Sequence, residues 1–329
     1  MSMERIMVTG EAGFIGSNLV RRLQEVFPDA AILVVDDFRI GTFENLAFGH
    51  DEPGGCFRGE VIARPLNELD LDALFEEFQP EVVFHEAAIT DTTMTDQAQM
   101  IRDNVEPFEI LLELACERAV TLVWASSAAT YGMDANGATT ARRPFKLADA
   151  GRPANVYGFS KWVMETRHHK AMADSPEAQI VGLRYFNVFG PGEQHKDKMA
   201  SMVYQLAQQM LAGKEPRIFH NGEQARDQVY VRDVVDATIA AAAEGAQSGI
   251  YNVGSGRATS FNQIIAALNK ALGTDRRTDY FDNPYTFYQD YTCADLTETA
   301  SGLGWSPAYE PEDAIIGYAR RLQTDARQP

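Results

Sequence analysis

The chain has 329 residues, of which 45% are hydrophobic and 23% charged, as is ordinary for a globular protein. This length is enough for a large core, and we expect two domains, or one domain with a substantial cap. The formal net charge of -18 argues against nucleic acid or an anionic membrane as a main partner, because both require clustered Lys and Arg.

The cysteines and the lengths of the apolar runs indicate the compartment of the protein and argue against a membrane span. Cys56, Cys116 and Cys293 are odd in number and far apart, and no CxxC pair occurs. We therefore expect reduced thiols, a cytoplasmic location, no secretory leader and no metal site. The apolar runs are of strand length and fall short of the ~20 residues that a membrane span requires.

The chain begins with a strand that runs directly into a glycine-rich turn. Arg5–Thr9 is a short apolar run, and Gly10, Gly13 and Gly16 follow it in a GxxGxxG spacing. Such glycines permit close approach to a pyrophosphate, and the helix predicted over Ser17–Val26 aims its N-terminal N–H groups at it. A glycine turn alone has low specificity, so the elements that follow decide its meaning.

A second strand ends in a pair of carboxylates. Ala31–Val35 is apolar and leads to Asp36, about 20 residues beyond the glycines. A carboxylate at that point can accept hydrogen bonds from the diol of an adenosine ribose; the alternative is an aspartate that only caps the strand. Asp36 and Asp37 together would repel a 2′-phosphate, for which Arg39 partly compensates.

Strands and helices continue to alternate, which predicts a doubly wound parallel sheet. We expect helices over Asp70–Phe78 and Asp103–Glu117, and strands over Glu81–His85 and Thr121–Ala125. Ligands bind such sheets at the C-terminal ends of the strands.

Two segments that follow strands carry residues suited to such a site. We interpret His85 as a structural residue, and the small Ala87 and Ala88 leave room for a cofactor against the backbone. The serine-rich segment 126–132 follows the next strand.

A tyrosine and a lysine lie four positions apart near the start of a further predicted helix. At this spacing Tyr157 and Lys161 share one helix face. A free tyrosine has a pKa near ~10, and a neighbouring ammonium group lowers that pKa. The pair indicates a proton-transfer site, although YxxxK also occurs by chance on solvated helices.

The pattern changes beyond residue 190. A helix over Met199–Leu211, the segment Arg217–Phe219 and the aromatic-rich run Tyr280–Tyr291 predict a smaller substrate-binding domain. We predict that the Rossmann domain comprises residues 1–175. Segments near 180–190 and 229–253 return to it, and the second includes a predicted helical element over 234–243. Residues 191–329 form mainly the substrate-binding domain. Arg226 is the candidate to neutralise a diphosphate, and a salt bridge with Asp227 is the alternative.

Taken together, these motifs resemble the extended short-chain dehydrogenase/reductase superfamily (NAD-dependent epimerases and dehydratases), which acts on nucleotide sugars. The residues that carry the resemblance are Gly10–Gly16, Asp36, Ser127, Tyr157 and Lys161. More narrowly, nearly the whole chain resembles the ADP-glycero-manno-heptose 6-epimerases, which make a lipopolysaccharide precursor. The segments concerned are 84–86, 126–132, 155–158, 184–188, 195–196, 199–201, 226–227, 229–231 and 294–297.

The resemblance implies an epimerase that oxidises a carbinol to a ketone and returns the hydride to the opposite face. It implies that Tyr157 is the acid/base, Lys161 lowers its pKa, and Ser127 hydrogen-bonds the reacting oxygen. Lys196 would be a second acid/base; the alternative is a loop lysine. The implied cofactor-binding residues are Gly10, Gly13, Phe14, Ile15, Gly16, Asp36, Asp37, Glu86, Ala87, Ala88, Asn104, Tyr157, Lys161, Val188 and His195. The implied substrate-binding residues are Ser127, Asn187, Lys198, Gln205, Phe219, Arg226 and Tyr288.

Several departures from the family pattern bear on the cofactor and the sugar. Glu11 replaces a glycine, and we expect its carboxylate to point to solvent. The family typically uses NADP, with a lysine where this chain has Phe43, whereas the two aspartates after the second strand slightly favour NAD. Lys198 replaces a small residue, and one residue fewer separates Phe219 from Arg226, which leaves the exact sugar open.

Three other functions are compatible with parts of the pattern. A 4-epimerase of UDP-hexoses or UDP-N-acetylhexosamines would keep Ser127, Tyr157 and Lys161. A 4,6-dehydratase would need an acidic pair where Ala128 and Ala129 stand. A catalytically silent dinucleotide-binding protein would not need the Ser, Tyr and Lys together. The expected partner is a nucleotide-diphosphate sugar, and we expect a homo-oligomer.

Overall fold

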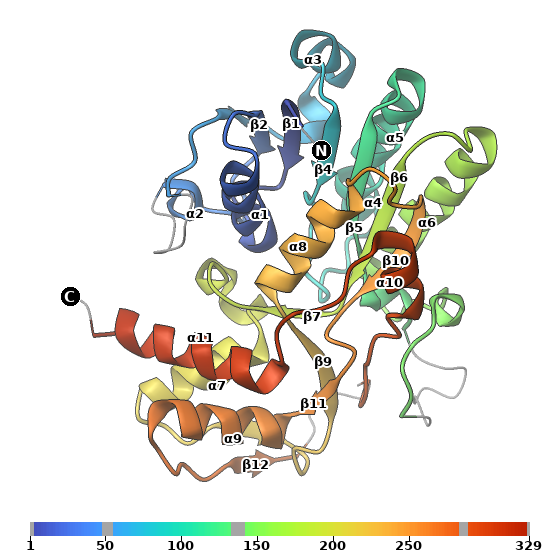
Figure 1. The fold of residues 1–329 in the computed structure, drawn as a ribbon. Coiled ribbons are helices and arrows are strands. Elements are labelled where there is room, and N and C mark those ends of the chain that lie inside the picture. The colour runs from blue at the N-terminus through green and yellow to red at the C-terminus, as the bar shows by residue number, and fades with distance from the viewer. Residues whose placement is uncertain (1–2, 48–54, 133–141, 283–288, 328–329) are drawn as a thin grey trace.

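The computed structural model describes residues 3–47, 55–132, 142–282 and 289–327. Its centre is a seven-stranded sheet in the order β10-β6-β5-β4-β1-β2-β3, in which every neighbouring pair is parallel (Figure 1). The Rossmann-like α/β class is thereby confirmed. The strands are β1 (Arg5–Thr9), β2 (Ala31–Asp36), β3 (Glu60–Ala63), β4 (Val82–His85), β5 (Thr121–Ser127), β6 (Ile180–Tyr185) and β10 (Gly249–Val253).

Helices cover both faces of this sheet, which is why its central strands are apolar throughout. The helices α1 (Phe14–Val26) and α8 (Val231–Ala241) lie on one face, with α2 (Glu44–Ala47) and α10 (Thr297–Leu303) near them. The other face carries α3 (Leu71–Phe78), α4 (Gln97–Asn104), α5 (Glu106–Arg118) and α6 (Val156–Asp174). Short 3-10 turns occupy Leu66–Glu68, Ala128–Thr130, Leu147–Asp149 and Gln194–Met199.

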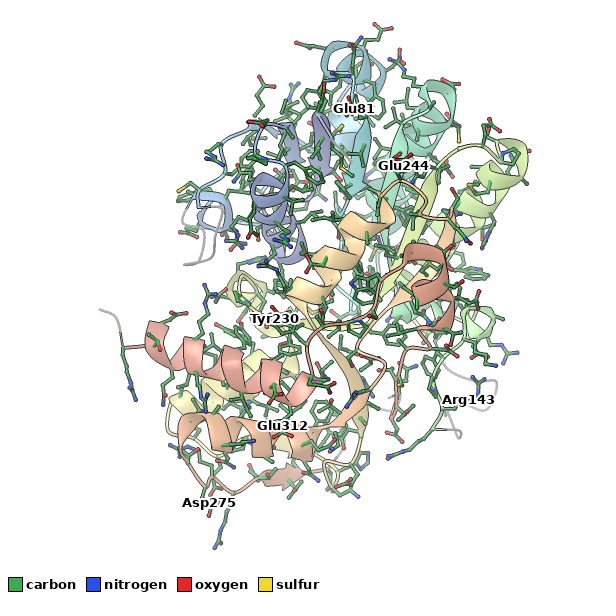
Figure 2. The ribbon with its side chains drawn as sticks, in the orientation of Figure 1. Glu81, Arg143, Tyr230, Glu244, Asp275 and Glu312 are labelled. Atoms are coloured by element: carbon green, nitrogen blue, oxygen red, sulfur yellow. The ribbon has the colours of Figure 1, made fainter. Side chains whose placement is uncertain are left out.

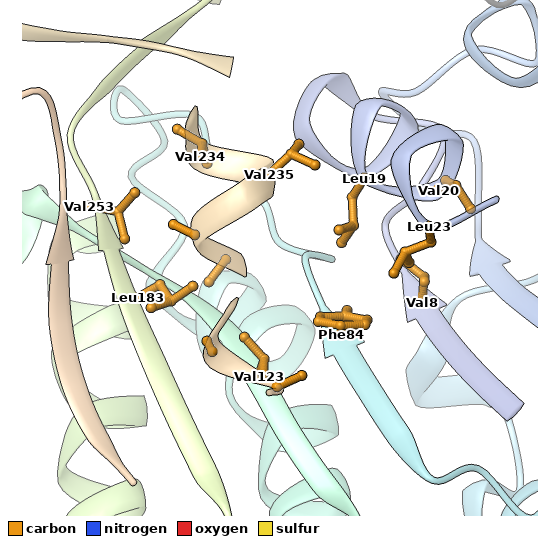
Figure 3. Packing of buried hydrophobic residues seen from close by; sticks show 14 of the residues in the cluster. Val8, Leu19, Val20, Leu23, Phe84, Val123, Leu183, Val234, Val235 and Val253 are labelled. Carbon is orange, nitrogen blue, oxygen red and sulfur yellow. The ribbon is translucent and has the colours of Figure 1, made fainter. Parts of the chain in front are cut away.

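The core beneath α1 and α8 shows how the two helices are held. Leu19 and Leu23 from α1 and Val234 from α8 belong to one buried cluster with Val8 and Leu183 of the sheet (Figure 3). All five side chains are completely buried. Each contributes roughly 1.5–3 kcal/mol by burial, which fixes α1 and therefore the turn that precedes it.

A second group of elements has its own core. The helices α7 (Met202–Leu211), α9 (Phe261–Leu272) and α11 (Pro311–Asp325) pack together beside the paired strands β8 (Arg217–Phe219) and β12 (Asp279–Phe281). These elements lie together in the lower part of Figure 1.

A three-stranded sheet connects the two groups. It contains β7 (Asn187–Phe189), β9 (Ala225–Tyr230) and β11 (Ala258–Ser260). Tyr230, labelled in Figure 2, packs against Phe189 and Tyr309 at this junction. The division into domains at residues 175 and 191 stays a prediction.

Several element boundaries differ from those expected. The first helix begins at Phe14, not Ser17, so it follows Gly13 directly. The long helix expected over 103–117 is two helices that meet at Val105, because Pro107 lacks the N–H that a continuous helix needs there. The helix expected from Met199 begins at Met202, where the Ser201 side chain accepts a hydrogen bond from the Tyr204 N–H.

The expected orientation of Glu11 is wrong. Its side chain is fully buried, and neither carboxyl oxygen has a hydrogen-bond partner among the described residues. Burial, together with the charge of Asp36, raises the pKa of Glu11 to about 9. A protonated, neutral carboxyl is therefore the form that this position holds at neutral pH.

Candidate active site

A cavity of about 890 Å³ lies at the C-terminal ends of the central strands. The ends of β1, β2, β4, β5 and β6 form one wall, and residues of α7, β8, β9 and β12 contribute to the other. The position is the one where doubly wound sheets bind their ligands. Every predicted site residue within the described ranges lines this cavity except Asn104.

The glycine turn forms a cradle that side chains would fill. Gly10 has φ +76°, and a Cβ there would lie 2.5 Å from the Ala87 nitrogen. A Cβ on Gly16 would lie 2.3 Å from the Gly10 carbonyl oxygen. The first helix has no side-chain cap at Gly13, so its N-terminus can receive an anion. These features fit the pyrophosphate of a dinucleotide, with Phe14 and Ile15 also lining the cavity.

Asp36 faces the cavity and also shapes the turn. Its carboxylate accepts hydrogen bonds from the Ala12 N–H (3.0 Å) and the Phe38 N–H (2.7 Å). Burial is the main cause of its raised pKa. Since a carboxylate accepts about four hydrogen bonds, capacity remains for a ribose diol.

Arg39 is held by two carboxylates at the same end of the cavity. Its guanidinium pairs with Asp37 and, at 2.7 Å, with Asp103 of α4. Asp103 also accepts a hydrogen bond from Arg102 at 3.0 Å. The arginine that sequence reasoning offered to a 2′-phosphate is thus neutralised by contacts within the protein.

Tyr157 and Lys161 are brought to the cavity by the first turns of α6. Asn155 caps this helix by accepting a hydrogen bond from the Gly158 N–H at 2.7 Å. The Lys161 ammonium, which is fully buried, donates to the Ala125 carbonyl oxygen of β5 at 2.7 Å. Burial lowers the pKa of Lys161 to about 8.

The pKa of Tyr157 differs from the expectation that Lys161 lowers it. Burial raises this pKa, while a hydrogen bond with Ser127 acts in the opposite direction and the charge of Glu86 raises it further. Desolvation of the phenolate is the dominant effect because the tyrosine is itself buried beneath Ile89 and Met100. A phenol that holds its proton is suited to act as an acid toward a developing alkoxide.

Glu86 enters the cavity from the end of β4. Its Oε1 accepts a hydrogen bond from the Tyr185 hydroxyl at 2.8 Å. Burial raises the pKa of Glu86 to about 7, against the attraction of Lys161. Tyr185 was missed by sequence reasoning; its place as the last residue of a buried strand was the available signal.

The loop after β7 brings His195 and Lys196 to the glycine turn. The Asn45 amide donates to His195 Nδ1 at 3.0 Å and to the Ala12 carbonyl at 2.8 Å. This contact leaves Nε2 as the protonated nitrogen of a neutral ring. Lys196 Nζ lies 5.4 Å from the centre of the Phe14 ring. Burial lowers the pKa of Lys196, opposed by the charge of Glu193.

The far end of the cavity contains the predicted substrate-binding residues. Asn187, Lys198, Gln205, Phe219 and Arg226 line it, as do Ser127 and the predicted cofactor-binding residue Val188. The ring of Phe219 packs edge-on to Phe281, with centroids 6.0 Å apart. The Asp227 carboxylate accepts hydrogen bonds from three backbone N–H groups, of Ser255, Gly256 and Ala294, so it is engaged away from Arg226.

Two predicted residues stand apart, and several others were missed. Asn104 does not line the cavity: its side chain accepts from the Ile89 N–H at 2.7 Å and donates to the Ile89 carbonyl at 3.1 Å, so its role is to hold that backbone. Tyr288 lies outside the described residues. The missed lining residues that carry polar or aromatic groups include Arg64, Asn67, Thr90, Thr92, Thr93, Asp103, Tyr185, Phe186, Gln209, Arg217, Gln224, Gln228 and Phe281.

Comparison with known proteins identifies the class of this site. A model of the NAD dependent epimerase/dehydratase family matches residues 6–254. The chain belongs to this family. The resemblance drawn from the sequence is confirmed at this level, and the protein is an enzyme of the NAD(P)-dependent sugar-nucleotide epimerase type.

Solved structures of the epimerase/dehydratase family superpose over almost the whole chain. ADP-L-glycero-D-manno-heptose 6-epimerase of Helicobacter pylori is 38% identical, with a TM-score of 0.84 over 97% of this chain and 96% of that one. UDP-glucose 4-epimerase of Thermotoga maritima is 28% identical, with a TM-score of 0.84 over 98% and 99%. UDP-N-acetylglucosamine 4-epimerase of Methanobrevibacter ruminantium is 26% identical, with a TM-score of 0.84 over 98% of each chain.

A helix that crosses a bilayer needs about 20 consecutive, mostly apolar residues. Among the described residues, no helix combines the length and apolarity needed to cross a membrane.

Proposed function

We propose that the protein is an ADP-glycero-manno-heptose 6-epimerase. The observation that carries the proposal is the position of Lys196, which lines the same cavity as Tyr157 but comes from a different element. Burial lowers the pKa of Lys196, as a lysine used for proton transfer near neutral pH requires. The 38% identity to the Helicobacter pylori 6-epimerase, against 26–28% for the two 4-epimerases, supports the same choice.

The proposed reaction needs two proton transfers and one stable oxyanion contact. Tyr157 exchanges the proton of the reacting hydroxyl, Ser127 donates a hydrogen bond to that oxygen, and Lys161 holds positive charge nearby. Lys196 serves the second face of the planar ketone. The bound nicotinamide supplies the acceptor and donor of the hydride.

We propose NAD as the cofactor. Asp36 and Asp37 place negative charge where NADP carries its 2′-phosphate, and Arg39 is already paired with Asp37 and Asp103. A relative of this chain, the UDP-glucose 4-epimerase of Thermus thermophilus, was solved in complex with NAD. Since the hydride must be returned before release, we expect the cofactor to remain with the protein through purification. Mass measurement of the extracted dinucleotide tests this, and recovery of NADP would reverse the choice.

The serious alternative is a 4-epimerase of UDP-hexoses or UDP-N-acetylhexosamines. The TM-score of 0.84 is the same for the 6-epimerase and the two 4-epimerase structures, so overall similarity in fold does not separate the two functions. A 4-epimerase would use Tyr157 for both faces. The deciding experiment is Lys196→Met, assayed on ADP-glycero-manno-heptose and on UDP-galactose or UDP-N-acetylgalactosamine. We expect heptose turnover to fall by ~100-fold or more.

Lys198→Met is the matched control, because Lys198 lines the cavity two positions further on but is exposed. We expect it to raise KM for the nucleotide sugar with little change in kcat. Heptose turnover that survives Lys196→Met, or turnover confined to the UDP-sugars, would establish the 4-epimerase instead.

We also propose that the protein acts as a homo-oligomer in the cytoplasm. Ile110 of α5 and Phe159 of α6 are 43% and 51% exposed, and these two helices lie side by side. Apolar side chains gathered on adjacent helices are suited to bury one another between two copies. Light scattering on the purified chain tests the association, and a strictly monomeric mass would exclude it.

A further inference from the structure

Glu86 is a half-buried carboxyl that the proposed proton transfers do not use. A chain of hydrogen bonds fixes it in the cavity wall. Tyr185 donates to Glu86 at 2.8 Å and lies 2.8 Å from the Thr238 hydroxyl, which itself donates to the Val234 carbonyl of α8 at 2.8 Å. The carboxyl at the end of β4 is thus held by β6 and α8.

The groups that face Glu86 make its charge important. Lys161 and Tyr157 lie near enough on α6 for the Glu86 charge to act on the pKa of both. His85, the preceding residue, stays neutral because burial lowers its pKa to about 3. Tyr185 is the hydrogen-bond donor, and burial keeps its pKa well above the ordinary value.

A second carboxylate near Lys161 provides a contrast. Glu165 is buried, and it pairs with the Arg184 guanidinium at 2.7 Å. Glu86 instead accepts from a neutral phenol and forms no ion pair among the described residues, although the Lys161 charge acts on its pKa. Its negative charge can therefore act on whatever lies in the cavity.

We propose that Glu86 supplies the negative charge that biases the site toward the oxidised, positively charged nicotinamide over the reduced, neutral one, with Tyr185 as its positioning residue. In a buried site, a fixed charge discriminates more strongly than in water between ligands that differ by one charge. The inference rests on the proposed function, because it requires the nicotinamide at this site. It explains why a carboxyl lies beside Lys161, which alone would disfavour a cation.

The bias depends on pH in a defined direction. With a pKa of about 7, Glu86 gains its charge as the pH rises through neutrality. The preference for NAD⁺ over NADH should therefore increase from about pH 6 to about pH 7.5. Lys161 loses its own charge only toward its pKa of about 8, so this window reports mainly on Glu86.

The experiment compares bound with free dinucleotide on the full chain. The protein is first freed of the dinucleotide that copurifies with it. It is then equilibrated with known mixtures of NAD⁺ and NADH and separated, and both bound forms are quantified. We expect Glu86→Gln to lower the preference for NAD⁺ by about 10-fold near pH 7.5, since one charge interaction in such a site is comparable to one pKa unit. The preference of the variant should also no longer change with pH.

Three further variants make the result specific. Glu86→Asp keeps the charge and should keep the preference within about 2-fold. Tyr185→Phe removes the donor, which should move the pH dependence to higher pH. Glu113→Gln removes the same charge from an exposed position on α5 and should change nothing.

The outcomes separate this inference from the proposed function. If Glu86→Gln binds both dinucleotides with the unaltered preference and pH dependence, the role of Glu86 is overturned while the epimerase proposal stands. If the unaltered protein binds neither dinucleotide, both are overturned. Circular dichroism of each variant establishes that it is folded. Should the glutamine variant not fold, Tyr185→Phe decides the question, because a pH dependence that does not move would overturn the role of Glu86.

Discussion

Glu11 is a residue whose protonation state follows mainly from its burial. It lies in the glycine turn beneath the cavity, fully buried and near Asp36, with a pKa raised to about 9. A folded-state pKa above the ordinary 4.5 means that the folded chain binds a proton which the unfolded chain releases at neutral pH. The associated stability is complete below pH 4.5 and is lost as the pH rises toward 9.

We therefore expect Glu11→Gln to stabilise the protein in mildly alkaline solution. The amide resembles the neutral acid but never ionises, so the free energy of unfolding near pH 8 should rise by on the order of 2 kcal/mol. Near pH 5 the variant and the unaltered protein should differ little. Urea unfolding at both pH values measures this, and equal stabilities at pH 8 would mean that Glu11 is solvated.

Tyr157→Phe tests the acid/base assignment. Removing the hydroxyl leaves a buried phenyl ring of almost the same volume, so we expect the fold to persist while kcat falls by ~100-fold or more. The measurement is turnover of the nucleotide sugar together with thermal unfolding. Near-normal turnover would remove Tyr157 from the mechanism.

Tyr131→Phe is the matched control for that variant. Its hydroxyl donates to Asn252 at 2.6 Å within the core and does not line the cavity. Its loss should therefore lower the free energy of unfolding by ~1–2 kcal/mol with a small effect on kcat.

At the scale of elements, the loop between β7 and α7 determines where His195 and Lys196 lie. Glu193 holds both ends of this loop: its buried carboxylate accepts from the Gly190 N–H at 3.1 Å and from the Ser201 hydroxyl at 2.9 Å. Asn18 of α1 also donates to the Pro191 carbonyl at 2.9 Å. The loop is thus attached to the helix that follows the glycine turn.

We expect Glu193→Gln to loosen this loop. The glutamine side chain has one NH₂ group in place of an accepting carboxylate oxygen, and this group would face the donors that Glu193 now accepts from. The lost hydrogen bonds should lower the free energy of unfolding by ~1–3 kcal/mol. Because Lys196 depends on the loop for its position, kcat should fall as well. Gln208→Ala, at an exposed position of α7 away from the loop, is the control and should leave kcat within about 2-fold. Unchanged kcat in Glu193→Gln would show that Lys196 is positioned by other contacts.

Sequence patterns within short segments predicted the helices and strands, because each helix or strand depends mainly on residues that are close along the chain. The apolar runs, the glycine spacing and the Tyr157–Lys161 pair all lie within single segments, and the structure brings them to one cavity. The burial of Glu11 and the pairing of Arg39 with Asp103 could not be predicted from the sequence. Both depend on contacts between segments that are distant along the chain. The first helix began early for a similar reason, because its start depends on how the turn packs.

At the scale of the whole molecule, charge is distributed unevenly. The chain carries a net charge of -18, yet the cavity is lined by more basic than acidic side chains among the described residues. The basic ones are Arg39, Arg64, Lys161, Lys196, Lys198, Arg217 and Arg226, and the acidic ones are Asp36, Asp37, Glu86 and Asp103. A nucleotide-diphosphate sugar is therefore repelled at long range and attracted at short range.

This distribution predicts a maximum in the dependence of kcat/KM on salt. At an ionic strength of ~0.01 M the Debye length is ~30 Å, so the net negative charge of the whole protein repels the approaching substrate. At ~0.1 M the Debye length is ~10 Å, and mainly the basic residues of the cavity interact with the substrate. We expect kcat/KM to rise over this range as the repulsion is screened, and to fall toward ~1 M as the attraction of the cavity is screened. Arg226→Gln removes one of the attracting charges and should make the fall less steep. A steady decrease from the lowest salt would mean that the basic residues of the cavity dominate at every distance.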